Sequence, residues 1–349
     1  MNRNQFFRKV LLSVCSAGAI LASAGNALAQ EVIELKVSHY LPPQHTINKE
    51  LLRWAGELNE KSHGQLKVSV FPAGQMGPVQ RQYDLARTGV SDMSFFLHGS
   101  LPGRFALTEL AQLPYVFMSD TGRNLSSADA SALLTSLSGR LESEYQGTKI
   151  LYLIAQPTIG LYFNKQVVRS PADMKGQRIR HNGPVPARML EAWGATPASL
   201  PPAELADALE KRTLNGMLFN AEAAQAFQLA SGIRSVTDLN AYAVTFALVI
   251  NAKRYESLPA PLKKLIDDST GVEAARRVGA LYDDAEVAGR KYLQDNKVTF
   301  VTPTSAEVQA FRAPLAPIVK DVIDQTQSKG LPAQAFYSEI RARVNKAGK

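Results

Sequence analysis

The chain has 349 residues, of which 45% are hydrophobic and one is a cysteine, and its formal net charge is +8 at neutral pH. Basic and acidic residues are interspersed, with no basic block, which argues against a nucleic-acid-binding surface. A single cysteine excludes a disulfide framework and a cysteine-rich metal centre. A chain of this length can bury a large core, and the length favours two domains over one.

Residues 1–29 have the features of a secretory signal peptide. They open with three basic residues, Arg3, Arg8 and Lys9. Residues 10–24 are small and apolar, and Ala27–Ala29 is an A-x-A cleavage site, so we expect cleavage after Ala29 and export to the periplasm. Lipidation of Cys15 is a weaker alternative, because Val14 is large for the position that precedes a lipidated cysteine. Removal of the segment leaves no cysteine and a net charge of about +5, since it takes three basic and no acidic residues with it. We expect no direct membrane insertion of the mature chain.

The first part of the mature chain alternates strands and helices. Two-residue alternation predicts strands, and apolar residues three or four positions apart predict helices. The predicted elements are a strand at 33–39, a helix at 46–61, a strand at 66–71, a helix at 79–87 and a strand at 92–97. This β-α-β-α-β order is typical of a parallel sheet with right-handed crossovers.

The rest of the chain has further strands and then becomes mostly helical. Buried strands are predicted at 149–155, 160–164 and 242–251, helices near 187–193 and 203–212, a long helical stretch at 262–296 and a late strand at 298–301. Thr304 and Glu307 form a capping-box pattern at the start of a helix that Pro314 and Pro317 must kink or restart. We interpret this as an α/β fold of two units with strands passing between them.

Motifs for catalysis or for cofactors are missing from the sequence. The five histidines have no metal-binding spacing, and neither a P-loop, a GxGxxG fingerprint nor a GxSxG elbow occurs. Ser100 follows a predicted strand, but we interpret its segment as a strand-to-loop turn. We therefore expect no cofactor, no metal and no enzymatic activity. The competing hypothesis is a periplasmic enzyme that uses His98 with a carboxylate that the sequence does not place.

Arg178 and Arg180 lie two positions apart on a short predicted strand that ends at a Gly/Pro-rich loop. Side chains two apart on a strand face the same side. A guanidinium at the end of a strand can form two parallel hydrogen bonds with a carboxylate. Periodicity alone does not say which of the two arginines has this role, and both could be surface residues.

Several segments, in order along the mature chain, resemble the DctP-type solute-binding proteins of TRAP (tripartite ATP-independent periplasmic) transporters. The opening segment LKVSHYLPPQHT and the strand that ends in FPAGQMG are similar to the start of that family. They are followed by LARTGVSDMSF, LAQLPYVF, SPADMKGQRIR with GATP, and INAKRYESLPAPLKKLI. The order and spacing of these segments over about 310 residues carry the resemblance.

The resemblance implies a two-domain periplasmic binding-protein fold of type II-like topology, with mixed sheets, a ligand cleft between the domains and a long helix spanning both. Domain I is expected at 30–156 and 246–285, and domain II at 157–245 and 286–349. The resemblance also implies an organic acid as ligand and pairs its carboxylate with Arg180, the arginine that ends KGQRIR. It implies the small and large TRAP membrane subunits as partners. We expect a monomer and no nucleic-acid partner. A binding component for another importer or for a sensor kinase remains an alternative.

Departures from the family pattern indicate what kind of acid is bound. Asn215 stands where the family has an aspartate, and Met217, Leu218 and Phe219 replace a polar run. If these positions line the cleft, then with Tyr40, Phe96 and Phe246 they form an apolar wall, which predicts a hydrophobic or aromatic monocarboxylate. The alternative is that 217–219 packs in the core. His98, Asn182 and Tyr40 are expected to add hydrogen bonds to the ligand.

Overall fold

The computed structural model describes residues 32–348, so the predicted signal peptide and its cleavage site lie outside the described residues. Residues Glu34–Lys349 form one compact unit, and the preceding unit, Met1–Ile33, is almost wholly outside the described part. Within the described range, the helices are too short or too polar to cross a bilayer.

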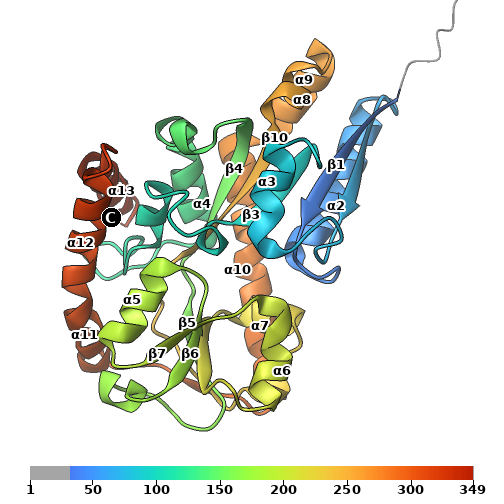
Figure 1. Ribbon diagram of the computed structural model, residues 1–349. Helices are drawn as coiled ribbons and strands as arrows, with labels where there is room; N and C mark the ends of the chain where they lie inside the picture. Colours follow the sequence, from blue (N-terminus) through green and yellow to red (C-terminus); the bar gives the residue numbers. More distant parts are fainter. Residues whose placement is uncertain (1–31, 349) are drawn as a thin grey trace, which may run out of the picture. The chain divides into compact units, whose positions relative to one another are not determined.

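The first sheet has five strands in the order β2-β1-β3-β10-β4 (Figure 1). The strands are β1 Ile33–His39, β2 Leu66–Phe71, β3 Met93–Leu97, β4 Thr148–Gln156 and β10 Val244–Asn251. β1 and β3 are parallel, which confirms the predicted crossover, whereas β10 runs antiparallel to both β3 and β4. Because β10 lies between β3 and β4 and is buried along its whole length, it is apolar on both faces.

The helices that adjoin the strands of this sheet along the chain come from three parts of the sequence. They are α2 Thr46–Lys61, α3 Gln82–Arg87, α4 Ser127–Ser136, α8 Ala252–Glu256 and α9 Ala260–Ser269. α2 has the predicted bounds, and its buried face includes Ile47, Leu51, Trp54 and Leu58. It ends before Gly64, whose φ of 81° lies in the left-handed region that glycine adopts at little cost.

The second sheet has six strands in the order β11-β9-β5-β8-β6-β7. The strands are β5 Gly160–Phe163, β6 Arg178–His181, β7 Thr196–Ser199, β8 Gly216–Phe219, β9 Ser235–Thr237 and β11 Thr299–Val301. β6 is parallel to β7 and β8, and β5 is antiparallel to β8 and β9. Both sheets are therefore mixed, as expected.

Short helices connect strands of the second sheet, and a helical C-terminal segment follows its last strand. They are α5 Pro184–Ala192, α6 Leu205–Glu210, α7 Ala221–Ala226, α11 Ser305–Arg312, α12 Ala316–Gln327 and α13 Ala333–Ala347. The capping box at Thr304 and Glu307 is present. The prolines act as predicted, since α11 gives way to a 3₁₀ turn at Ala313–Leu315 before α12 begins.

The long helix α10, Gly271–Asp295, contacts α4 as well as α7 (Figure 1). Two glycines of this helix permit close packing. A Cβ on Gly279 would lie 2.4 Å from the Ser127 carbonyl oxygen, and one on Gly289 would lie 2.3 Å from that of Ala221. The predicted single stretch 262–296 is divided at Gly271, whose φ is 78°.

Two carboxylates of α10 hold the first turns of these neighbouring helices. Asp283 accepts hydrogen bonds from the backbone N–H groups of Ser127 and Ala128 at 2.8 and 3.0 Å. One turn later, Glu286 accepts from those of Ala221 and Glu222 at 3.1 and 3.0 Å. Because the first N–H groups of a helix have no partner within the helix, these contacts fix α4 and α7 against α10.

Candidate functional site

A pocket lies where the carboxyl ends of strands from both sheets meet the amino end of the antiparallel strand β10. The first sheet contributes Tyr40, Leu97, Gln156, Val244 and Phe246, and the second contributes Arg180, Asn182, Leu218, Phe219 and Asn220. His45, Glu222, Phe227 and Tyr282 come from helices or their caps. Strand ends are the usual ligand-binding edge of an α/β sheet.

Arg180 is the cationic group of this cavity. Its side chain is only 3% exposed, and its Nε donates a hydrogen bond to the Leu200 carbonyl oxygen at 3.0 Å. No acidic residue between positions 32 and 348 forms an ion pair with it, and burial lowers the pKa of the Arg180 guanidinium to about 10. Arg178 is exposed, so the structure assigns the buried position to the second arginine of the strand. A buried cation without an anion is costly, and an anionic ligand would offset that cost.

Aromatic rings form much of the wall around Arg180. The Phe219 ring centroid lies 5.5 Å from the Arg180 Cζ atom, within the range of a cation–π contact. Phe246 lies between two further rings, stacking on Phe95 at 5.4 Å and on Tyr282 at 6.1 Å. Four residues predicted for the wall, Tyr40, Leu218, Phe219 and Phe246, thus line the cavity.

Neutral phenols lie close to the guanidinium. Burial raises the pKa of Tyr40 and of Tyr242 above that of a free phenol, although the Arg180 charge acts in the opposite direction on both. Both hydroxyls are therefore protonated at neutral pH. Tyr242 donates its hydrogen bond to the Asn182 Oδ1 atom at 2.7 Å, which orients the predicted residue Asn182 at the cavity wall.

Three predicted site residues do not line this cavity, and each has a structural reason. Phe96 lies on the opposite face of β3 from Leu97, because successive side chains of a strand alternate, and it packs against Tyr83 and Phe105. His98 is buried, with its ring nitrogens 3.0 Å from Thr245 Oγ1 and 2.6 Å from Tyr145 OH.

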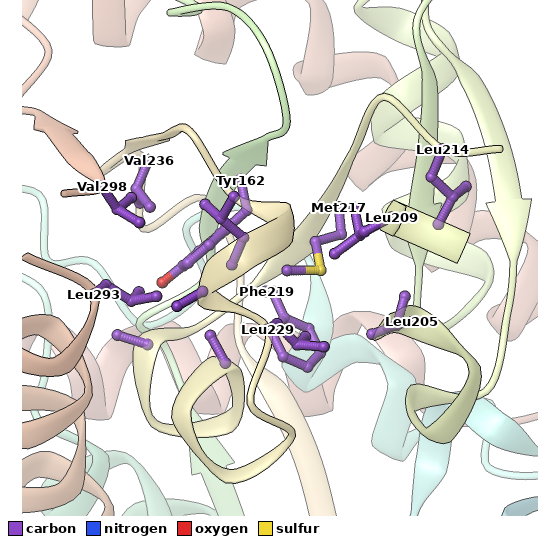
Figure 2. Packing of buried hydrophobic residues seen from close by; sticks show 14 of the residues in the cluster. Tyr162, Leu205, Leu209, Leu214, Met217, Phe219, Leu229, Val236, Leu293 and Val298 are labelled. Atoms are coloured by element: carbon purple, nitrogen blue, oxygen red, sulfur yellow. The ribbon is translucent and has the colours of Figure 1, made fainter. Parts of the chain in front are cut away.

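Met217 is the third, and it bears on the two alternatives for residues 217–219. Figure 2 shows Met217 and Phe219 together in the core cluster that also contains Leu209. Leu218 and Phe219 reach the cavity. Met217 is therefore core alone, Leu218 lines the cavity, and Phe219 belongs to the core cluster and also lines the cavity.

A second polar group of the cavity was not found from the sequence. Glu222, on α7, is 4% exposed, and burial raises the pKa of its carboxyl to about 7 although nearby Thr46 and Asn220 lower it. His45 Nε2 lies 3.4 Å from Glu222 Oε1, and His45 Nδ1 accepts a hydrogen bond from the backbone N–H of Ile47. Burial lowers the pKa of His45 to about 3, so its imidazole is neutral.

One sequence signal could have indicated this group. Glu222 lies three residues after a buried strand, at the start of a helix that is otherwise rich in alanine. Tyr282 lies on the face of α10 that also carries Gly279 and Gly289. A charged residue in such small, apolar surroundings suggests a buried carboxyl.

Ser100 and His98, the two residues considered for catalysis, do not form a catalytic pair in the structure. The Ser100 hydroxyl donates to the carbonyl oxygen of Leu97 at 2.7 Å, whereas both His98 ring nitrogens have other partners. Over residues 32–348, no group of three or more His, Cys, Asp or Glu side chains is arranged to hold a metal ion.

A pocket with a buried cation, at the ends of two mixed sheets, is the architecture of a ligand-binding protein. The family model for bacterial extracellular solute-binding proteins of family 7 (DctP) matches residues 37–326. The chain belongs to this family, which confirms the resemblance seen in the sequence.

Known proteins from several bacteria are similar to the chain. The outer membrane transporter protein TsaT of Comamonas testosteroni is 26% identical over 337 residues, or 95% of this chain and 97% of the relative. The solved structure of a TRAP solute-binding protein from a marine metagenome, specific for aromatic acid ligands and in complex with 3-hydroxybenzoate, is 27% identical. Its TM-score is 0.85, and the match covers 91% of this chain and 100% of that one.

A TRAP periplasmic solute-binding protein from Bordetella bronchiseptica, with bound (R)- and (S)-mandelate, is 26% identical with a TM-score of 0.80. The match covers 90% of this chain and 99% of that one. These likenesses confirm the expected fold, a two-domain α/β architecture of the TRAP solute-binding type.

Proposed function

We propose that the protein captures an aromatic monocarboxylate in this cavity and delivers it to a TRAP transporter. The observation that carries the proposal is Arg180, a buried guanidinium that has no acidic partner in the described part of the chain and faces an aromatic wall. A carboxylate would accept paired hydrogen bonds from this group, and the wall would take the ring of the ligand.

The apolar wall favours an aromatic body over a polar one. Burial of a ring against Phe219 and Phe246 contributes about 1.5–3 kcal/mol, comparable to a hydrogen bond with a charged group. A dicarboxylate or a sugar acid would instead place polar groups against these rings. The similar solved structures that hold 3-hydroxybenzoate and mandelate support an aromatic acid.

The cavity residues come from both sheets, so a bound ligand would favour closure of the two domains around it. Domain I would comprise 30–156 and 246–285, and domain II 157–245 and 286–349, with a hinge near Pro157 and Tyr242–Phe246. A ligand shifts the equilibrium toward closure only if it contacts both parts. Tyr40 and Arg180, which line the same cavity from different sheets, would provide those contacts.

In this function, the chain would act in the periplasm after removal of residues 1–29. It would present the bound acid, as a monomer and without chemical change, to the small and large TRAP membrane subunits. A periplasmic relative, the 2,3-diketo-L-gulonate-binding protein YiaO of Escherichia coli, is 27% identical over 212 residues and supports this location.

A thermal-shift screen of residues 30–349 tests the proposal. Aromatic monoacids, keto acids, dicarboxylates and sugar acids are compared side by side. A ligand at a thousand times its Kd adds about 4 kcal/mol to the free energy of unfolding, which raises the Tm by several degrees. We expect this rise with aromatic monoacids. Larger shifts with succinate or sialic acid would refute the aromatic assignment, and turnover of the bound acid would reveal an enzyme.

A further inference from the structure

The end of the cavity formed by α7 and α10 has buried polar groups for which the described residues supply no well-aligned hydrogen-bond partner. Neither carboxyl oxygen of Glu222 accepts a hydrogen bond of good geometry from residues 32–348, and the Tyr282 hydroxyl also has no partner in that range. Both residues line the cavity. A buried polar group without a partner costs about 1–3 kcal/mol, so this arrangement requires an explanation.

The neighbouring carboxyl Glu286 shows that the fold can satisfy a buried acid where the acid is structural. Its oxygens accept hydrogen bonds from the backbone of Ala221 and Glu222 and from the Asn220 side chain. Glu222 is at least as buried and lies beside the start of α2, with His45 Nε2 3.4 Å from its Oε1, yet neither of its oxygens accepts a well-aligned hydrogen bond there, and it also lines the cavity. Its unpaired oxygens therefore point to a ligand group as the partner.

Glu222 and Arg180 both line this cavity and have different neighbours. Both act on the Tyr40 phenol, where the guanidinium lowers and the carboxyl raises the pKa of the hydroxyl. Arg180 contacts Phe219, whereas Glu222 contacts His45 and lies near enough to Tyr282 to raise the pKa of its phenol. A ligand held at Arg180 by its carboxylate can thus extend past the rings toward Glu222.

We propose that Glu222 and Tyr282 form a subsite for a hydroxyl substituent of the ligand, remote from its carboxylate. The inference rests on the proposed function and narrows its ligand class to hydroxylated aromatic acids. A hydroxyl group can donate to a Glu222 oxygen and accept from the Tyr282 hydroxyl, so it satisfies both unpaired groups at once. A methyl group satisfies neither, and an ammonium group cannot accept from Tyr282.

Calorimetric titration of the unmodified protein tests the inference without any variant. The probes are benzoate, 3- and 4-hydroxybenzoate, and 3- and 4-methylbenzoate, in which a methyl group of similar size replaces the hydroxyl. We expect at least one hydroxybenzoate to bind about 10- to 100-fold more tightly than its methyl counterpart, as for a hydrogen bond to an otherwise unpaired buried acid. Equal affinities for both pairs would overturn the inference.

Variants of Glu222 then test whether this residue causes the preference for a hydroxyl over a methyl substituent. Glu222→Met removes the acceptor at similar volume and should reduce the hydroxyl-to-methyl ratio to less than threefold. Glu222→Gln keeps an acceptor oxygen and should retain most of the ratio. Glu109→Met is the matched control, since Glu109 is a buried carboxyl with its pKa raised to about 7 that does not line the cavity.

The ratio is measured within each protein, so partial unfolding of a variant does not alter it. A hydroxyl preference that survives Glu222→Met would overturn the assignment. The same titrations separate the two proposals. Binding of benzoate with no hydroxyl preference rejects the subsite alone, whereas the absence of binding by every probe rejects the proposed function.

Discussion

Replacement of Arg180 by methionine should separate ligand binding from stability. Methionine retains an unbranched apolar stem and removes the charge. Burial lowers the pKa of Arg180 from 12.5 to about 10, which corresponds to about 3 kcal/mol of lost solvation for the charged form. Arginine is protonated in both folded and unfolded chains at neutral pH, so this cost does not vary with pH there.

Two contacts of Arg180 oppose that cost in the ligand-free protein. The hydrogen bond to the Leu200 carbonyl contributes about 1 kcal/mol, and the cation–π contact with Phe219 contributes about 1–2 kcal/mol. Because these contributions nearly balance the desolvation cost, Arg180→Met should change the free energy of unfolding by no more than about 1 kcal/mol, with either no change or a gain.

Ligand affinity should respond to Arg180→Met much more strongly than the free energy of unfolding does. Without the guanidinium, the carboxylate of the ligand would enter the cavity unpaired, at a cost of about 2–4 kcal/mol. This corresponds to an affinity about 30- to 1000-fold lower. Calorimetric titration with the acid that gives the largest thermal shift, and thermal unfolding with and without it, measure both quantities.

The exposed Arg178 gives the matched control, because Arg178→Met removes the same charge from the same strand outside the cavity. It should leave affinity within about threefold. Unchanged affinity in Arg180→Met would show that the carboxylate is held elsewhere. A fall in ligand-free Tm of ten degrees or more would show that the buried charge is itself a stabilising element and refute the balance given above.

Three further predictions concern stability and the closeness of backbone contacts. Glu222 has a folded pKa of about 7, above its ordinary value of 4.5, so its stabilising contribution is complete below pH 4.5 and is lost as the pH rises to 7. Urea unfolding of the ligand-free proteins should therefore show that the free energy of unfolding of Glu222→Gln rises by about 3 kcal/mol relative to wild type over this interval. The same pH dependence in both proteins would contradict this prediction. In Gly99→Ala, the new Cβ would lie 1.8 Å from the carbonyl oxygen of Asn182, which lines the cavity, so we expect titration to show at least tenfold weaker ligand binding; unaltered affinity would count against this contact. Gly289→Ala should destabilise by about 1–3 kcal/mol because its Cβ meets the α7 backbone, whereas Gly56→Ala, with open space in α2, should stabilise by about 0.5–1 kcal/mol; equal effects in urea unfolding would show that packing at α10 does not decide the sign.

Much of the secondary structure could be predicted because local patterns determine it. α2 has the predicted bounds, since its apolar face and the glycine after its end are local features. The position of β10 between β3 and β4 could not be derived from its own residues. Its uniform burial indicates only that both faces are covered, and the partners come from distant parts of the chain.

The site was predictable only in part, for the same reason. Arg180 follows from its place at a strand end and from the family motif. Phe96 was assigned to the wall although its neighbour Leu97 occupies that position, because sequence alternation shows that two faces exist without showing which one meets the cavity. Glu222 and Tyr282 come together through the packing of α7 against α10, for which the sequence gives no register.

One turn of α10 carries three residues that have three different roles. Tyr282 lines the cavity, Asp283 holds the start of α4, and Glu286 holds the start of α7. A substitution in this turn therefore alters ligand contact and the anchoring of two helices together. In evolutionary terms, the turn is a constrained segment, and changes of ligand preference within this lineage should accumulate on the opposite walls, at β8 and β10, where a side chain can change without releasing a helix.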